Sequence, residues 1–355
     1  MASLTKVAIT TRRIIRYSIY LILFIIFARL TILVTTRIYR HFFPEPPPPP
    51  TLEFGKLPDL PFPLREFPSD VVFTLQTPDE KLPKLTTQAK VFFMPQAVPN
   101  IRAVEFAREQ ALKLGFNPDG RELVETVYLF QRTDAPASLN MNIVTGVFSI
   151  SYDLNANPSI LQQIPPPPEV SVNQVKGYLT GANLLPNDIR DGPTSHEFIR
   201  VEQGQFVNAF SLSESDFVKI NLFRKDFDEI KSLPPDFTEA NVWFMLSGSS
   251  EAGSKIVAAE YHYFPLDEEK FATYPLKTSE QAWEELKAGR AFIANYEPSE
   301  EAEIFIRRVY VAYYDAGQYT EFYQPVIVFE GDNNFAAYVP GIASEYYGEE
   351  NEQEQ

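Results

Sequence analysis

Cysteine is absent from this sequence, and histidine occurs only three times in 355 residues. Without cysteine the chain has no disulfide, no iron–sulfur cluster, no cysteine zinc site and no thiolate nucleophile. The histidines His41, His196 and His262 are too far apart to form a pair at helical or short-loop spacing, so they predict no zinc site. Small secreted domains of eukaryotes tend to be rich in disulfides, whereas many bacterial proteins outside the cytoplasm have none. The absence of cysteine therefore favours a bacterial source.

Sequence motifs for nucleophilic catalysis and for phosphate or calcium binding are missing too. Residues 247–250 lack the glycine spacing of a nucleophile elbow, and the acidic residues 267–269 lack the alternating spacing of an EF-hand loop. Both segments are typical of solvated turns. We therefore predict no catalytic residue, no metal site and no cofactor. A pair of catalytic carboxylates leaves no sequence signature because its separation is spatial, so a hydrolase remains an alternative.

Basic residues are scarce outside the N-terminus. The formal net charge is −16, yet residues 1–40 contain seven basic residues and no acidic one, so residues 41–355 carry −23. Such a surface repels phosphate backbones, and we expect no nucleic-acid partner. The length and the hydrophobic content of 45% exclude disorder throughout and suffice for two modest domains.

Residues 17–36 form one long apolar segment, of about the 20 residues that a transmembrane helix needs. Arg29 interrupts it, but an off-centre arginine can extend its charged end toward the lipid headgroups. Arg29 is also a candidate for contact with an acidic group on a partner helix within the bilayer. No small-residue cleavage site follows the apolar segment, so we expect the anchor to be retained.

The distribution of charge around this segment predicts its orientation. Four basic residues precede it and two follow it. The positive-inside rule therefore places residues 1–16 in the cytoplasm, as a basic tail, and the C-terminal region outside it. We predict a single-pass protein of the cell membrane.

A proline-rich segment follows the apolar one. Residues 44–68 hold ten of the 30 prolines, which predicts a polyproline II spacer over residues 37–69. Its simplest role is to hold a domain away from the bilayer. Docking into an aromatic groove of a partner protein is the alternative.

The remaining pattern predicts an α+β fold of antiparallel sheets with a few packed helices. Helices are expected near residues 101–114, 172–182 and 279–288, each followed by strand-like segments, which indicates a repeated unit of one helix and a three-stranded meander. We divide this region at the proline run 165–168. The predicted parts are a first domain, residues 70–163, a second region, residues 164–344, and a disordered acidic tail, residues 345–355.

Tyrosines gather near the C-terminal end of the second region. Tyrosine is a common rigid anchor in protein interfaces, so this group is our candidate partner interface. Core packing is the alternative, because neighbouring strand residues face opposite sides of a sheet and at least one side is buried. The candidate residues are Tyr310, Tyr313, Tyr314, Tyr319 and Tyr323.

Roughly the last 70 residues carry a further pattern. Ala282 and Leu286 lie on the predicted helix, and residues 310–314, 324–326 and 337–340 follow as strand, turn and strand. This order resembles the C-terminal part of YycI-type regulators and, more loosely, PepSY-type modules. The resemblance implies an extracytoplasmic domain on a membrane helix that modulates a sensor histidine kinase in the same membrane.

The sequence thus predicts a non-enzymatic, membrane-anchored module that binds or regulates a membrane or envelope partner. The alternative is a surface-anchored hydrolase of cell-wall polymer or peptide. A hydrolase would show two carboxylates in a deep cleft, at least one of them with a raised pKa. A binding module would show a groove or patch with exposed aromatic side chains instead.

Overall fold

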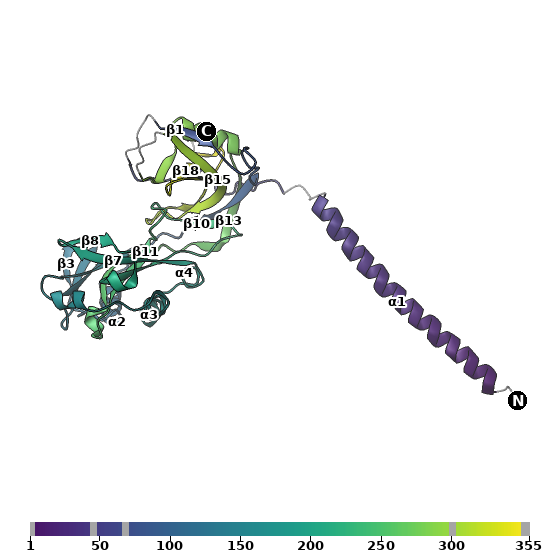
Figure 1. Cartoon of the computed structure of the whole chain (residues 1–355), viewed down its shortest axis with the longest axis horizontal. Coiled ribbons are helices and arrows are strands. Elements are labelled where there is room, and N and C mark those ends of the chain that lie inside the picture. The colour runs from purple at the N-terminus through teal and green to yellow at the C-terminus, as the bar shows by residue number, and fades with distance from the viewer. Residues whose placement is uncertain (1–3, 43–47, 66–70, 298–302, 349–355) are drawn as a thin grey trace. The chain divides into compact units, whose positions relative to one another are not determined.

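The computed structural model describes residues 4–42, 48–65, 71–297 and 303–348 (Figure 1). The chain separates into two compact units, residues 1–49 and residues 50–355. The first unit contains one long helix, and the second contains three β-sheets and the other helices. The predicted α+β class is confirmed.

Helix α1 (Leu4–Phe42) makes up the described part of the first unit. Its stretch Ile15–Arg37 has a mean hydropathy of 2.3 and is long and apolar enough to cross a membrane. At 1.5 Å per residue, this stretch rises about 35 Å, against about 30 Å of hydrocarbon in a bilayer. The hydroxyl groups of Thr31 and Thr36 donate hydrogen bonds to helix carbonyls one turn earlier, so they need no water.

A nine-stranded antiparallel sheet dominates residues 100–263, which we call the inserted lobe. Helices α2 (Ala103–Lys113) and α3 (Pro168–Gly181) pack against its core, and the short α4 (Asn187–Arg190) follows α3. Across the sheet the strands are β3 (Arg121–Val124), β4 (Val127–Gln131), β5 (Ala137–Asn142), β6 (Phe148–Tyr152), β12 (Ile256–Tyr261), β11 (Val242–Ser247), β9 (Phe217–Leu222), β7 (Thr194–Glu202) and β8 (Gln205–Asn208).

This sheet crosses the division that the sequence pattern places at residue 164. Strand β6, before the division, pairs with β12, after it, so that Ile150 lies opposite Ala259. The proline run leads into the first turn of α3, where a proline is well tolerated because that N–H has no helical acceptor. The prediction that residues 70–163 and 164–344 form separate regions is therefore wrong for this sheet.

Residues from both ends of the second unit form the terminal lobe, residues 50–94 and 264–348. Helix α5 (Ser279–Lys287) covers the larger sheet, with Ala282 and Leu286 buried against Phe329. The larger sheet contains β1 (Val72–Leu75), β15 (Glu303–Tyr314), β17 (Pro325–Gly331), β18 (Ala336–Pro340) and β14 (Phe292–Asn295), with β10 (Lys231–Leu233) also on β15. The smaller sheet contains β13 (Asp267–Pro275), β2 (Gln88–Phe93) and β16 (Phe322–Tyr323).

The chain order of the two lobes follows from these sheets. The terminal lobe begins with β1 and β2, the chain then builds the inserted lobe, and it returns with β13. Strand β10 lies between strands of the inserted lobe in the sequence, but it pairs with β15 of the terminal lobe. Strands β1 and β10 run parallel to β15, and the other pairs are antiparallel. Figure 1 shows the strands of the two lobes as separate groups.

Much of the predicted proline-rich spacer is packed into the terminal lobe. Leu57 is completely buried, and the ring of Phe62 stacks on that of Phe292 at 5.0 Å between centroids. The prediction of a free spacer is therefore wrong for residues 50–65, because apolar side chains between the prolines supply contacts to the core. Of the rest of the spacer, residues 37–42 belong to α1, and residues 43–47 and 66–70 lie outside the described part of the chain.

The start of the predicted disordered tail is packed as well. Tyr347 forms a parallel β-bridge with Leu57, and Tyr346 packs against the same cluster. Residues 349–355 lie outside the described part of the chain. The N-terminal and C-terminal segments of the second unit thus pair with each other, which closes the terminal lobe.

Candidate functional site

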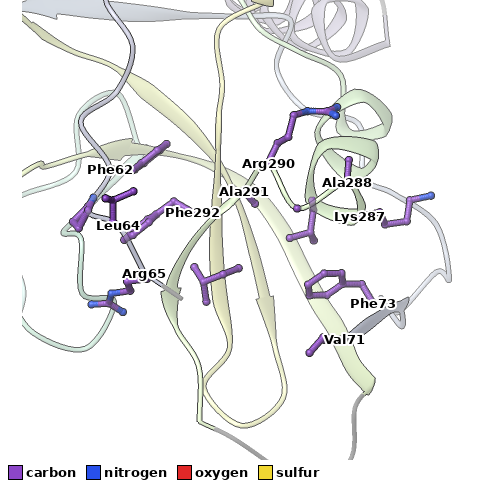
Figure 2. A pocket seen from close by; sticks show the side chains of 14 residues that line it. Phe62, Leu64, Arg65, Val71, Phe73, Lys287, Ala288, Arg290, Ala291 and Phe292 are labelled. Carbon is purple, nitrogen blue, oxygen red and sulfur yellow. The ribbon is translucent and has the colours of Figure 1, made fainter. Parts of the chain in front are cut away.

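A pocket of about 610 Å³ opens in the terminal lobe between the end of α5, the start of β14, residues 62–65 and β1 (Figure 2). Figure 2 shows Phe62, Arg65 and Phe292 on one side of the pocket and Phe73 and Lys287 on the other. The volume falls within the range of about 300–1,000 Å³ that is common for ligand pockets. Aromatic rings and cationic side chains therefore share one concave surface.

Specific contacts hold residues 62–65 along β14. Besides the stacking of Phe62 on Phe292, the Arg65 guanidinium donates a hydrogen bond to the carbonyl oxygen of Ala294 at 2.5 Å. It also pairs with Asp236 at 3.3 Å. This wall of the pocket is therefore built by the segment that sequence analysis takes for a spacer.

The charge of the pocket is opposite to that of the chain around it. Three cationic side chains, Arg65, Lys287 and Arg290, line it, and no acidic residue does. Arg65 pairs with Asp236 and Lys287 pairs with Glu284 at 2.7 Å, so Arg290 is the cation of this pocket that has no ion-pair partner among the described residues. In a chain with a net charge of −16, such a surface favours the binding of a ligand in which an anionic group is attached to an apolar one.

The structure corrects the tyrosine interface that the sequence suggests. Tyr313, Tyr314 and Tyr323 are buried, with exposed fractions of 0%, 2% and 1%. Burial also raises the pKa of Tyr313 and Tyr314 above the usual value, so both are neutral. Tyr310 and Tyr319 are half-buried. The prediction is wrong for the first three, because the sheet that contains β15 is covered on both faces.

The contacts of these tyrosines show why both faces are covered. Tyr313 packs against Phe92 of the smaller sheet at 5.4 Å, while Tyr314, on the opposite face, packs against Phe62 at 4.8 Å. The hydroxyl of Tyr310 donates a hydrogen bond to the carboxylate of Glu330. These aromatic side chains are core residues that join separate segments of the terminal lobe.

The other sequence candidates are distributed over both units. Arg29 lies on α1 within the apolar stretch Ile15–Arg37, and its contact with a partner helix stays a prediction. His196 lies on β7, where its ring meets that of Phe198 at 5.2 Å. Within the described ranges, no cluster of three or more histidine, aspartate and glutamate side chains could hold a metal ion.

An ion cluster that sequence analysis missed joins the two lobes. Arg224 lies two residues after the end of β9, and its guanidinium donates to Asp188 at 2.7 Å and to Asp315 at 3.1 Å. It also donates to the carbonyl oxygen of Phe264 and lies over the ring of Tyr263. Only 1% of the Arg224 side chain is exposed. No local pattern marks these residues, because the two carboxylates are far apart in sequence.

A histidine–carboxylate pair lies at the same junction. The Nε2 atom of His262 is 3.0 Å from Glu260, and Nδ1 is 3.2 Å from the carbonyl oxygen of Gly317 in the terminal lobe. Gly317 has a φ of +66°, and a Cβ atom there would lie 2.6 Å from the Asn241 side chain, so glycine suits both the backbone and the space. Both ring nitrogens face oxygen acceptors, an arrangement that favours the protonated form of the His262 ring.

The titration of His262 tests this geometry. The hydrogen bond to Glu260 raises the pKa of His262 above its usual 6.5. We expect NMR titration to give a pKa above that value and the Glu260→Gln variant to lower it, with Glu214→Gln as an exposed control. Because the folded-state pKa is raised, this pair stabilises the fold below about pH 6.5 and stops doing so as pH rises through the folded-state pKa. Equal values in wild type and Glu260→Gln would contradict the pairing.

Together, these features define an α+β globular unit with a cationic and aromatic pocket, preceded by one long apolar helix. No family model matches the chain, and no curated protein matches it. An uncharacterized protein from Eubacterium rectale ATCC 33656 is similar in structure, with a TM-score of 0.34 and 10% sequence identity over 75% of this chain and 86% of that chain.

Proposed function

We propose that this is a single-pass membrane protein whose globular unit lies outside the cytoplasm and binds or regulates a membrane or envelope partner without catalysing a reaction. The observation that supports the anchor is the division of the chain into one apolar helix and a separate acidic unit. The excess of basic residues before the apolar stretch supports the orientation, with the N-terminus in the cytoplasm.

The pocket in the terminal lobe supports a partner with an acidic contact region. Its cations surround the aromatic rings of Phe62, Phe73 and Phe292, a combination that favours an acidic segment carrying apolar side chains. A sensor histidine kinase in the same membrane is the partner that the resemblance to YycI-type regulators implies.

Three exposed carboxyl groups have lowered pKa values, which do not suit the general acid of a hydrolase. Asp134, Asp191 and Asp332 each accept a hydrogen bond from an arginine, and this bond lowers the pKa of the carboxyl group. A general acid of a glycosidase needs a raised pKa instead. These three groups therefore do not fit the role that the hydrolase alternative requires.

Crosslinking in native membranes followed by mass spectrometry tests the proposal. Wild type should capture a specific membrane or envelope partner, and Arg290→Glu should reduce that capture about tenfold, because it places a negative charge against an acidic contact region. Arg121→Glu, an exposed charge reversal in the inserted lobe, is the matched control and should capture the partner normally.

A further variant distinguishes the contribution of the helix to partner capture from that of the globular unit. Replacing residues 1–43 with an unrelated anchor should abolish capture if the helix itself contacts the partner, and should preserve it if the globular unit suffices. Absence of a specific partner with every variant, wild type included, would overturn the regulatory proposal.

A further inference from the structure

The nine-stranded sheet ends on each side in a strand with one free edge, β3 on one side and β8 on the other. The β3 edge is charged, because Arg121, Glu122 and Glu125 lie on it or just after it and are exposed. Charged side chains commonly prevent a sheet edge from pairing with another chain. The β8 edge lacks this protection, since the eleven residues 203–213 include no charged residue.

The backbone groups of β8 point alternately toward β7 and toward the free edge. Ala209, which directly follows β8, donates its N–H to the carbonyl oxygen of Phe198 in β7. Consecutive residues of a strand direct their N–H and C=O groups to opposite sides, so Val207 also bonds to β7. Phe206 and Asn208 therefore direct their N–H and C=O groups to the free edge, where another strand can extend the sheet.

Aromatic side chains are exposed along the same edge. The ring of Phe206 meets that of Phe217 at 6.0 Å between centroids, yet Phe206 is 53% exposed. Phe210, just beyond the strand, is 94% exposed. An uncharged edge with free backbone groups and exposed aromatic side chains is typical of a surface that pairs with a further strand.

The lack of charge favours a second copy of this chain as the source of that strand. Two copies carry the same negative net charge, and like charges placed opposite each other weaken an interface. Two copies therefore meet best where neither contributes a charge, as in residues 203–213. An acidic or basic segment of another protein would be matched by opposite charges, which this edge does not offer.

Strand β8 is also complementary to itself. When two β8 strands pair antiparallel about a two-fold axis at Val207, Phe206 of each copy lies opposite Asn208 of the other copy. The outward N–H and C=O groups of both strands then meet and form four hydrogen bonds, two for each of the symmetry-related pairs. Val207 lies on the axis, opposite the same residue of the other copy.

We infer that this protein forms a dimer in which the β8 strands of two copies pair, so that their nine-stranded sheets become one continuous sheet. The pairing uses residues of the inserted lobe, whereas the cationic pocket is built by the terminal lobe. The dimer and the capture of a partner by the pocket are therefore measured separately, and either can fail while the other holds.

Disulfide trapping in native membranes tests the inference, because the full-length chain has no cysteine of its own. Val207→Cys should give a disulfide-linked dimer on mild oxidation. Opposite residues without mutual hydrogen bonds have Cα atoms about 4.5 Å apart, which a disulfide spans. Gln205→Cys, on the same face of β8, should give none, because in this register the two substituted residues lie about 13 Å apart along the strands.

The opposite edge of the sheet and the edge backbone supply the remaining variants. Val124→Cys, exposed on β3, should stay monomeric. In the Val207→Cys background, Asn208→Pro should lower the dimer yield about tenfold, because it removes an edge N–H from each copy. Phe206→Lys adds a charge to the edge without altering the backbone, so it should lower the yield even if Asn208→Pro is poorly folded.

Three outcomes would overturn the inference. The first is the absence of a dimer in Val207→Cys. The second is an equal dimer yield in Gln205→Cys or Val124→Cys, which would show unspecific collision. The third is a disulfide between Val207→Cys and a different protein in place of the dimer, which would assign the edge to another partner.

Discussion

Removal of residues 1–49 should leave the globular unit folded, whereas removal of residues 1–65 should destabilise it by about 5 kcal/mol or more. The second truncation deletes Leu57, which is completely buried, and Phe62, which stacks on Phe292. Loss of one such side chain from a core typically costs about 2–5 kcal/mol. Because domains are stable by only about 5–15 kcal/mol, the longer truncation approaches complete unfolding.

Urea denaturation of the two truncated proteins measures this difference, and a pair of leucine substitutions refines it. Leu57→Ala should destabilise the unit by about 2–5 kcal/mol. Leu64→Ala removes the same atoms from a fully exposed side chain and should leave the denaturation midpoint unchanged. Equal stability of the two truncations would mean that residues 50–65 are the free spacer that the proline content suggests.

Replacing Arg224 with methionine should destabilise the globular unit by about 3–5 kcal/mol. The substitution keeps an apolar stem but removes the guanidinium that bonds to Asp188 and Asp315. Both carboxylates are largely buried, with 8% and 14% of their side chains exposed, so each would lose its counter-charge without gaining full access to water.

An exposed arginine in the same lobe provides the control. Arg190 pairs with Asp191 at 3.0 Å, but more than half of each side chain is exposed. Arg190→Met should therefore leave the denaturation midpoint where it is, since water replaces the partner. Hydrogen exchange should also become faster in residues 315–318 of Arg224→Met, because the cluster joins that loop to the inserted lobe. Equal midpoints for the two variants would contradict the structural role of Arg224.

Features that depend on neighbouring residues could be predicted from the sequence. The helices expected near residues 101–114, 172–182 and 279–288 are α2, α3 and α5, because apolar residues at helical spacing report on local structure. The single long apolar helix is confirmed for the same reason, since length and hydropathy alone define it. The α+β class then follows from the strand-like segments between the helices.

Partners that are distant along the chain could not be predicted in the same way. The pattern of β6 does not specify its pairing with β12. Nor does the pattern of β15 show that Tyr313 and Tyr314 are both buried, because another sheet and residues 50–65 cover its two faces. Periodicity identifies a strand but not what packs on it.

The candidate sites, too, combine residues that are distant along the chain. The pocket combines Arg65 with Lys287 and Arg290, and the ion cluster combines Arg224 with Asp188 and Asp315. The sequence by itself determined the composition, the apolar helix, the helix positions and the acidic charge, which are local or summed properties. Only the tertiary structure decided which charges meet and which prolines pack, because contacts between distant segments depend on the pairing of strands across the whole unit.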